Sequence, residues 1–587
     1  MKYAAIKSRL SGLQVLRLLS DEQRTSFSKH ILFSIVLALF EVFSLTSVLP
    51  LLFYLIHPTG SKSATGIVGH ILSLTDSVSW ITLLICVLIL FLIKNIAGVW
   101  QTNSQLKFLN ELYLSFSERI YHRFYSQPWS AYTHENSAEA FRKIKNTAFD
   151  FTSYVLNNYL LLITDVVICL LMIVIMAWFD FRILFVILFL FLPIGIFYYF
   201  FRKKVILKID QSFRELTPVT NIVLTQGISA YTEARIYKKQ HYFIKRFIEL
   251  SRITTAQLSD LKTFSGLPAR ILEIAGILLF AGIVAYVKLG GISEQHVLVF
   301  IGLFSLALYR IMPSFTRMLQ SLSQIQSYAY TVTELKETLG DSEAATSSAK
   351  DIAKIDFNTS IALHDVSFQY EDKSKVLLDH VTFEIRKGEF IVLEGPSGTG
   401  KTTLLHILSG IIANYKGALL IDGAPLTAET VSYWQSQIGL VTQSPVILQD
   451  TLLHNIAFGE FEDEVDNVRL ADAIRSAGLD AFVKSLPEGI YTLIGENGVT
   501  LSGGQRQRLC LARALYRQPK VLLLDEVTNQ LDEENKVYIL SVLQRMCNSG
   551  KTVVLISHDP LVRKFASRIL RLEDAALVQT NLQKQVG

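Results

Sequence analysis

Residues 395–402 have the composition and spacing of a phosphate-binding loop. They read Gly-Pro-Ser-Gly-Thr-Gly-Lys-Thr and stand between a short apolar run at 390–393 and apolar residues with helical spacing at 403–408. Glycines let successive backbone N–H groups curl around phosphate oxygens, and the N-terminus of the following helix adds a favourable dipole. In this context Lys401 is expected to reach the β- and γ-phosphates of ATP, and the Thr402 hydroxyl to bind Mg²⁺. The expected cofactor-binding residues of this segment are Gly395, Pro396, Ser397, Gly398, Thr399, Gly400, Lys401, Thr402 and Thr403.

Two adjacent acids could supply the hydrolytic chemistry. Asp525 ends the apolar run 521–524, and Glu526 follows it directly. The carboxyl end of a buried parallel strand faces the ligand crevice in open α/β sheets. We therefore expect Asp525 to hold Mg²⁺ through water, and Glu526 to polarise the attacking water as a general base.

Residues 501–505, Leu-Ser-Gly-Gly-Gln, form a second glycine turn that opens a helix, an anion-binding shape without a lysine. Followed by Arg-Gln-Arg at 506–508, this pentapeptide resembles the signature of ATP-binding cassette (ABC) proteins. The resemblance implies that the turn closes over the γ-phosphate held by a partner subunit. Two ATP molecules would then lie between two ATPase domains in a head-to-tail dimer, and a homodimer is the simplest expectation. The nucleotide contacts implied for this turn are Ser502, Gly503, Gly504 and Gln505.

Four further residues match elements of the same family in the expected order between 355 and 575. Tyr370 matches the aromatic residue that stacks on adenine. Gln443 matches the glutamine that links the γ-phosphate site to the membrane domain, which makes it a candidate catalytic residue and metal ligand. Glu496 resembles the acidic loop that contacts the partner's cytoplasmic helices. His558 matches the histidine that orients the γ-phosphate and the water, so the expected catalytic set is Glu526, His558, Lys401 and Gln443.

One stretch departs from the family pattern. After the general base the family usually reads Ala-Thr-Ser-Ala-Leu-Asp, whereas this chain reads Val-Thr-Asn-Gln-Leu-Asp at 527–532. Asn529 and Gln530 thus replace small residues at the expected dimer contact. This puts the geometry of communication between the two ATP sites in doubt, and leaves hydrolysis itself expected.

The elements that must position these residues fall into two halves of different composition. Half of the 587 residues are hydrophobic and only 18% are charged, which indicates a membrane component. From 355 onward, short strand-like runs at 390–393, 521–524 and 552–556 alternate with helical patterns, which predicts an α/β domain with a largely parallel sheet. Before 340, six apolar stretches are long enough to cross a membrane. They lie near 31–55, 81–100, 159–178, 183–201, 271–287 and 297–311.

The predicted fold class is an all-α six-helix transmembrane domain followed by an α/β ABC ATPase domain containing the phosphate-binding loop. The expected domains are an amphipathic N-terminal segment at 1–30, a transmembrane domain with long cytoplasmic helix extensions at 31–339, a polar linker at 340–354 and the nucleotide-binding domain at 355–587. Lys and Arg concentrate in the N-terminal segment and in the connections 101–155 and 202–270, so both termini are expected in the cytoplasm. With no recognisable signal segment, we expect a bacterial inner membrane protein.

Neither the net charge nor the cysteines point to a further function or site. The formal net charge of +5 is modest for this length and does not predict nucleic-acid binding. The four scattered cysteines, interpreted as buried apolar residues in a reducing compartment, have neither metal-ligand nor disulfide spacing.

Six spans before an ATPase resemble the exporter type of ABC protein. That type carries two short cytoplasmic coupling helices, expected here near 128–136 and 229–236. Candidate substrate contacts are cations within or near spans, because ionisable groups at membrane depth usually face a cavity. They are Arg310, Arg317, Arg270 and Lys94.

Arg310 and Arg317 stand seven residues apart, about two helical turns, and could hold a phosphate or pyrophosphate. Equally, they could neutralise Glu273 or line a watery vestibule. The Arg-x-x-Pro-Ser-x-x-Arg stretch at 310–317, with shorter matches at 41–50 and 236–243, resembles bacterial lipid-linked oligosaccharide flippases. The resemblance implies a lipid-linked or amphipathic substrate whose pyrophosphate meets a basic belt. Alternatives are an ABC exporter of drugs, lipids or peptides, a mechanical ABC ATPase that acts on DNA or ribosomes, and a weakly hydrolysing channel-like ABC protein.

Overall fold

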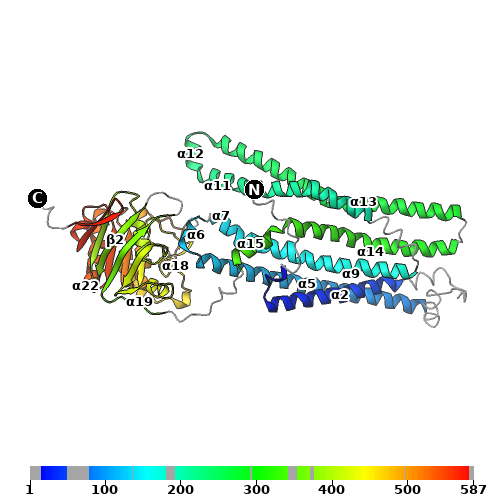
Figure 1. Ribbon diagram of the computed structural model, residues 1–587, viewed down its shortest axis with the longest axis horizontal. Coiled ribbons are helices and arrows are strands. Elements are labelled where there is room, and N and C mark those ends of the chain that lie inside the picture. Colours follow the sequence, from blue (N-terminus) through cyan, green and yellow to red (C-terminus); the bar gives the residue numbers. More distant parts are fainter. Residues whose placement is uncertain are drawn as a thin grey trace. The chain divides into compact units, whose positions relative to one another are not determined.

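The computed structural model describes residues 15–48, 79–134, 137–179, 192–290, 294–340, 353–370, 376–495 and 498–580. The chain divides into two compact units (Figure 1). The helical unit comprises Met1–Tyr125 and Ser137–Ser342, and the α/β unit comprises Ser126–Asn136 and Glu343–Gly587. The segment 126–136, predicted as part of the membrane domain, therefore groups with the α/β unit.

Long helices make up the helical unit. Four described helices are long and apolar enough to cross a membrane: Asp21–Thr46, Trp80–Ser126, Glu139–Ile175 and Gln240–Gly282. They overlap the first, second, third and fifth predicted spans. The fourth predicted span falls partly outside the described residues, and the sixth lies in a helix whose side chains are described only in part, so the count of six stays a prediction. The helical elements are α2 (Asp21–Thr46), α5 (Trp80–Ser126), α7 (Ser137–Phe141), η2 (Arg142–Thr147), α8 (Ala148–Asp150), η3 (Phe151–Leu156), α9 (Asn157–Phe179), η4 (Arg202–Ile206), α11 (Leu207–Ser229), α12 (Tyr231–Ile236), α13 (Gln240–Gly290), α14 (Glu294–Ser327) and α15 (Tyr330–Leu339).

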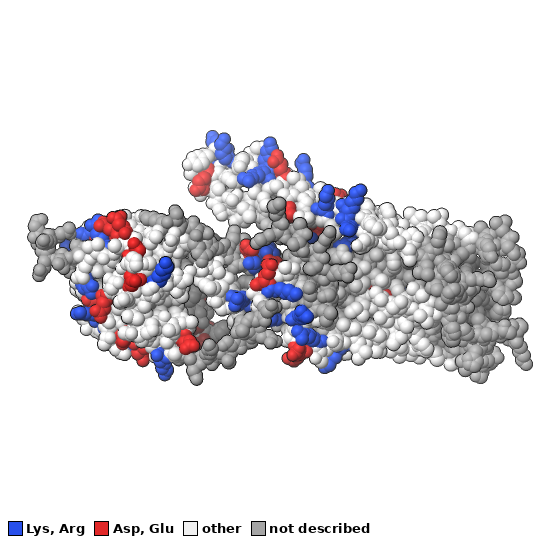
Figure 2. All heavy atoms as spheres, viewed as in Figure 1, with Lys and Arg blue, Asp and Glu red and all other residues white. Residues whose placement is uncertain are grey.

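Charge is distributed unevenly along these helices. In Figure 2, blue and red side chains of the helical unit gather on the half that carries α12 and α15, and the described part of the remaining visible face is nearly free of them. Helices α5 and α13 contain 47 and 51 residues, more than twice the roughly 20 residues that a membrane crossing needs. Both helices therefore have room for an apolar stretch and a polar extension.

A six-stranded sheet organises the α/β unit, with strand order β12-β11-β3-β10-β9-β6. Strands β3, β6, β9, β10 and β11 run parallel, and β12 is antiparallel to β11. Every residue of β3, β9 and β10 is buried, as near-continuous apolar runs in a parallel sheet require. The strands of this sheet are β3 (Phe390–Glu394), β6 (Ile438–Val441), β9 (Val521–Asp525), β10 (Thr552–Ile556), β11 (Arg568–Glu573) and β12 (Ala576–Thr580).

A four-stranded antiparallel sheet, ordered β2-β1-β4-β5, and a two-stranded β7-β8 ribbon complete the strands. Their bounds are β1 (Ser360–Phe368), β2 (Leu378–Arg386), β4 (Lys416–Ile421), β5 (Ala424–Pro425), β7 (Asp450–Thr451) and β8 (Leu493–Ile494). The helices are α6 (Trp129–His134), α16 (Lys401–Leu408), α17 (Val431–Ser436), α18 (Leu452–Ile456), η6 (Glu462–Glu464), α19 (Asn467–Ser476), α20 (Asp480–Ser485), η7 (Gly489–Tyr491), α21 (Gly503–Tyr516), α22 (Glu533–Asn548) and η8 (Val562–Lys564).

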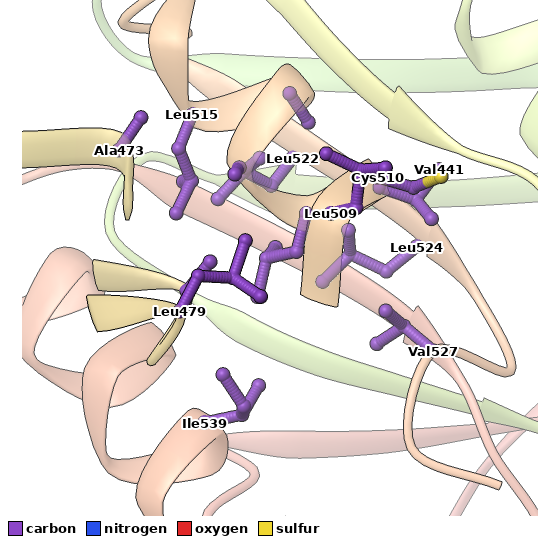
Figure 3. Packing of buried hydrophobic residues seen from close by; sticks show 14 of the residues in the cluster. Val441, Ala473, Leu479, Leu509, Cys510, Leu515, Leu522, Leu524, Val527 and Ile539 are labelled. Carbon is purple, nitrogen blue, oxygen red and sulfur yellow. The ribbon is translucent and has the colours of Figure 1, made fainter. Parts of the chain in front are cut away.

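The largest core of the α/β unit surrounds α21. Leu509, Cys510 and Leu515 of α21 pack with Leu522 and Leu524 of β9, and side chains of neighbouring helices close the cluster (Figure 3). The helix that begins at the 501–505 turn is therefore fixed against the strand that ends in the two acids. The predicted α/β architecture with a largely parallel sheet is confirmed.

Candidate functional site

Parallel strands bring the predicted chemistry to one edge of the sheet. The strands β3, β6, β9 and β10 are neighbours and end, respectively, just before the phosphate-binding loop (395–402), Gln443, Glu526 and His558. Because carboxyl ends of parallel strands share an edge, these four segments meet there.

The phosphate-binding loop has the backbone shape that its glycines allow. Gly398 and Gly400 have φ of 79° and 106°, a region that other residues rarely adopt. At Gly395 an added Cβ would collide with the backbone of Leu572. Lys401, the first residue of α16, is buried and its Nζ donates to the carbonyl oxygens of Gly395 and Pro396 at 2.7 and 2.8 Å. Burial lowers the pKa of Lys401, and the charges of Glu526 and Asp525 oppose that shift.

The two expected magnesium-binding side chains are in direct contact. Thr402 Oγ1 donates to Asp525 Oδ2 at 2.7 Å. Asp525 is only 4% exposed, and burial raises the pKa of its carboxyl, while the Thr402 hydroxyl lowers it in part. A hydroxyl and a carboxylate beside a phosphate loop fit Mg²⁺, which takes few protein ligands and completes its shell with phosphate and water.

Glu526 stands next to Asp525 in a left-handed conformation, with φ of 52°. Its Oε2 accepts two amide hydrogen bonds, from Gln443 Nε2 at 2.9 Å and from Asn529 Nδ2 at 2.8 Å. The contact with Gln443 joins two residues that are 83 positions apart in the chain. Asn529 was not among the predicted site residues, although its departure from the family pattern was a signal for it.

The signature turn (501–505) is held by a reciprocal cap. Ser502 Oγ accepts from the Gln505 N–H at 3.2 Å, and Gln505 Oε1 accepts from the Ser502 N–H at 2.9 Å. This arrangement satisfies two donors at the start of α21 and fixes the glycines between them. The structure therefore presents Ser502 and Gly503 at a helix N-terminus, where anions are stabilised.

Three predicted residues, Tyr370, His558 and Glu496, have no described contact with the two acids at 525 and 526. The Tyr370 hydroxyl lies 3.4 Å from Thr403 Oγ1, and its ring packs edge-on against Phe368 with centroids 4.9 Å apart. An aromatic face beside the phosphate-binding loop suits a purine ring. His558 is exposed after β10. Glu496 lies outside the described residues.

A buried asparagine, not predicted as functional, supports the segment after Gln443. Asn455 is fully buried; its Oδ1 accepts from the Leu448 N–H at 2.9 Å, and its Nδ2 donates to the carbonyls of Leu448 and Thr451, each at 3.0 Å. Arg513 of α21 donates to the Asn455 carbonyl at 2.8 Å and to Oδ1 at 3.1 Å. These bonds connect the signature helix to the Gln443 segment, and only the fold brings them together.

The first predicted coupling segment contacts the phosphate-loop helix. Trp129 of α6 packs against the core of the α/β unit, and its ring lies edge-on to His406 of α16 with centroids 5.0 Å apart. Burial lowers the pKa of His406. Since α16 begins at Lys401, one rigid helix joins the loop to this contact.

Three of the four predicted cations of the helical unit, Lys94, Arg310 and Arg317, are paired with acids from other helices. Glu41 of α2 accepts from Lys94 Nζ of α5 at 3.3 Å and from Arg310 of α14. Arg317 forms two bonds with Asp165 of α9, at 2.6 and 3.1 Å. The predicted alternative of neutralisation by Glu273 is not what the structure shows for these two arginines.

Arg270 differs from the other candidates. It pairs with Glu273 one turn along its own helix at 3.4 Å, and both side chains are largely exposed. The group of Glu41, Lys94 and Arg310 instead carries one excess positive charge, with side chains at most 20% exposed. Arg310 Nε is buried without a hydrogen-bond partner in the described structure, so this group retains an unused donor.

The second predicted coupling segment carries exposed apolar side chains. Around α12, Ile228, Tyr231, Ile236 and Tyr237 are each at least 67% exposed. This end of the helical unit is also its charged end (Figure 2), so these side chains are surrounded by polar surface. Exposed apolar patches with polar rims are typical of protein interfaces.

Comparisons with known proteins agree with this geometry. Residues 378–529 match the family model described as ABC transporter. The ATP-dependent lipid A-core flippase of Burkholderia orbicola (strain AU 1054) is 29% identical over 373 residues, 63% of this chain and 62% of the relative. That of Burkholderia thailandensis is 30% identical over 383 residues, 65% of this chain and 63% of the relative. The chain thus spans less than two thirds of the length of these relatives.

A solved structure extends the likeness in fold over nearly the whole chain. A bacterial Atm1-family ABC exporter with ATP bound matches with a TM-score of 0.72 at 20% identity, covering 95% of this chain and 94% of that one. The chain therefore has an ABC exporter fold, in which a helical domain with apolar helices precedes an ABC ATPase domain.

Proposed function

We propose that this chain, which carries an ABC transporter ATPase domain after a helical membrane domain, is one half of an ATP-driven flippase. Its cargo would be a lipid-linked oligosaccharide or a similar polyprenyl-pyrophosphate glycolipid. The observation that carries the proposal is the group of Glu41, Lys94 and Arg310, an excess cation held among the apolar helices of the helical unit. An exporter of uncharged drugs would not need that charge.

The charge argument follows from the cost of ions at membrane depth. A cation in an apolar environment is expensive unless an anion compensates it. Glu41 compensates only one of Lys94 and Arg310, and Arg310 Nε has a free N–H. A phosphate or pyrophosphate head group would supply the missing anion and accept from the guanidinium, which prefers such planar, bidentate contacts.

The relatives support a lipid cargo. Those reported above are named ATP-dependent lipid A-core flippases. A lipid A-core type phosphoglycolipid is therefore the second candidate, since it shares a phosphorylated, amphipathic head. The alternative of a DNA- or ribosome-acting ATPase has no comparable support, because four described helices are long and apolar enough to cross a membrane. The weakly hydrolysing channel is disfavoured because both Glu526 and His558 are present.

The contacts described above support a role for each residue of the ATP site. Bound Mg²⁺ would supply positive charge at the phosphates, held by Thr402 and Asp525. Lys401 donates from a buried position and can exchange its loop carbonyls for phosphate oxygens. Glu526, oriented by Gln443, would accept a proton from the attacking water. We expect His558, which follows β10 at the same edge, to orient the γ-phosphate. We expect Tyr370 to stack on adenine.

A homodimer completes the site. The capped Ser502 turn has the features of an anion contact, and in the family resemblance it serves the ATP of a partner subunit. The exposed apolar side chains around α12 give a second surface suited to the partner's ATPase domain. We place the protein in a bacterial inner membrane with both termini cytoplasmic, consistent with the positive-inside distribution of its loops.

Reconstitution into liposomes tests the function. Wild-type protein is expected to flip a fluorescent polyprenyl-pyrophosphate glycan with ATP, and Glu526→Gln is expected to abolish both flipping and hydrolysis. A lipid A-core phosphoglycolipid forms the second arm. Flipping no faster with ATP than without it, in both arms, would refute the assignment.

Arginine variants test the cargo site. Arg310→Gln is expected to lower glycolipid-stimulated ATP hydrolysis about tenfold or more, the scale of a lost charge-assisted hydrogen bond. The matched Arg270→Gln, whose ion pair is exposed on one helix, is expected to change it less than twofold. Equal losses in both variants would remove the argument for the Glu41, Lys94 and Arg310 group.

A further inference from the structure

Asn529 and Gln530 are the residues that depart from the family pattern. Asn529 contacts Glu526, and Gln530 lies beside Gly503 of the signature turn. Asn529 Nδ2 donates to Glu526 Oε2 at 2.8 Å. The serine that the family usually places here is shorter and carries no amide, so this contact is a property of the present chain. It places two amide donors on a single carboxylate oxygen, because Gln443 uses the same Oε2.

The backbone of Glu526 is fixed as firmly as its side chain. Its N–H donates to the Ile556 carbonyl at 3.1 Å, and its own carbonyl accepts from Gln507 Nε2 at 3.2 Å. Within the described structure, Oε1 is the oxygen of this carboxylate that has no hydrogen bond. Both amides therefore leave Oε1 for the water that a general base must hold.

Gln530 extends this arrangement to the signature turn of the same chain. Its backbone N–H donates to Gln507 Oε1 at 3.1 Å, so Gln507 joins Gln530 to the carbonyl of Glu526. The Gln530 side chain lies so close to Gly503 that an added Cβ there would collide with its amide. The signature turn and the catalytic carboxylate are thus linked by a short series of contacts.

We propose that Asn529 is a positioning residue for Glu526, and that Gln530 and Gln507 tie this position to the signature turn of the same subunit. The inference rests on the proposed role of Glu526 as general base. In the proposed dimer the signature turn closes on the partner's ATP. When the signature turn of one subunit binds the ATP of its partner, the contacts through Gln530 and Gln507 then orient the Glu526 carboxylate of that same subunit for hydrolysis.

Three variants of full-length protein in detergent test this through basal ATP hydrolysis, without lipid cargo. Asn529→Ala is expected to lower kcat about three- to tenfold with KM for ATP unchanged, the scale of one hydrogen bond. Asn529→Asp keeps the shape but loses the donor and places a like charge beside Glu526, so kcat should fall further. Gln530→Ala should lower kcat, and its effect should combine with that of Asn529→Ala less than additively.

The order of the variants separates positioning from packing. A side chain that merely fills space predicts that the isosteric Asp is the milder change. The matched control is Asn467→Asp, an exposed asparagine at the start of α19, which should keep wild-type kcat. The proposal is wrong if Asn529→Asp retains wild-type kcat or exceeds Asn529→Ala, or if KM changes in place of kcat.

Failure of the proposed function gives a different result. If no glycolipid is flipped but Glu526→Gln still abolishes basal hydrolysis, the Asn529 variants still test the positioning of the general base. Only the proposed cargo is then wrong. If Glu526→Gln retains hydrolysis, Glu526 is not the base, and the positioning role of Asn529 falls with it. Thermal unfolding of each variant shows whether a loss of kcat comes from a loss of folding. Asn529→Ser is a second truncation that is measured in the same way.

Discussion

Cys510 and Cys547 lie in the core of the α/β unit, 3% and 7% exposed. Burial raises the pKa of both thiols, that of Cys547 to about 11. Cys547 Sγ also faces the Glu389 carbonyl at 3.7 Å. The two cysteines of this unit thus act as apolar side chains, as the sequence suggested, whereas Cys86 of the helical unit is exposed.

At the residue scale, we predict that Cys547 resists alkylation in the folded protein. A thiol with a pKa near 11 carries roughly 100-fold less thiolate at pH 8 than one near 9. Because the thiolate is the nucleophile, maleimide labelling of Cys547 between pH 7 and 9 should stay far below that of the unfolded chain. Mass spectrometry of the peptides measures this, and fast labelling in the native state at pH 8 would contradict it.

The sequence identified individual residues where their chemistry is contained in a local motif. Lys401, Thr402 and Asp525 could be predicted because the loop and the strand end carry recognisable spacing, and the structure brings Thr402 and Asp525 into contact. Asn455 and Asn529 could not be assigned roles, because their partners are set by tertiary packing. No local motif assigns a role to Asn529 or Asn455; their roles follow only from the contacts with Glu526 and Leu448 in the folded chain.

At the scale of elements, α18 and α21 are joined through a buried polar network. The Asn455 side chain forms hydrogen bonds with the backbone of the segment after Gln443, and Arg513 donates a hydrogen bond to the Asn455 carbonyl. The guanidinium also lies over the Phe458 ring, 4.4 Å from its centroid. Such a network holds one arrangement firmly when every member is satisfied, and becomes costly when one is removed.

Asn455→Ala should therefore lower the free energy of unfolding by about 2–3 kcal/mol, because it leaves buried donors and acceptors unpaired. It should also lower ATP hydrolysis, since the segment that carries Gln443 loses its support. Thermal unfolding and ATPase assays measure both. The exposed Asn548→Ala, at the end of α22, serves as control and should lie within about 0.5 kcal/mol of wild type.

The contact of α6 with α16 predicts a variant that separates glycolipid-stimulated hydrolysis from basal hydrolysis. Trp129→Ala removes the ring that packs on His406, and should reduce glycolipid-stimulated hydrolysis severalfold while basal hydrolysis persists. Tyr132→Ala, its more exposed neighbour, is the comparison. If both rates fall together for Trp129→Ala, this contact supports the ATPase fold itself and does not transmit a signal.

At the scale of the whole molecule, the sequence predicted the order of the two kinds of domain and the parallel sheet, because hydrophobic runs and strand periodicity are local signals. It did not predict which acids pair with Arg310 and Arg317, since those partners come from α2 and α9, more than 150 residues away. Pairings between distant helices depend on packing that no single segment contains.

The whole-molecule prediction is that two copies work together. In lipid nanodiscs the protein should have twice the chain mass of 66.2 kDa, with ATP and Mg²⁺ bound to Glu526→Gln. Substitution of Ser502 in one copy should impair hydrolysis by the Lys401 site of the other, which mixed dimers with differently tagged subunits measure. A monomeric mass under these conditions would contradict the shared site.

Segment 126–136 belongs to the α/β unit, yet the rest of that unit begins at residue 343. During synthesis this segment leaves the ribosome about 200 residues before the rest of the α/β unit begins, a delay of about 10–40 seconds at ordinary rates. Its apolar ring stays uncovered while the rest of the helical unit is synthesised. Assembly of the two units is therefore interleaved in time, and a chain truncated before residue 343 should expose Trp129 to chaperones and proteases.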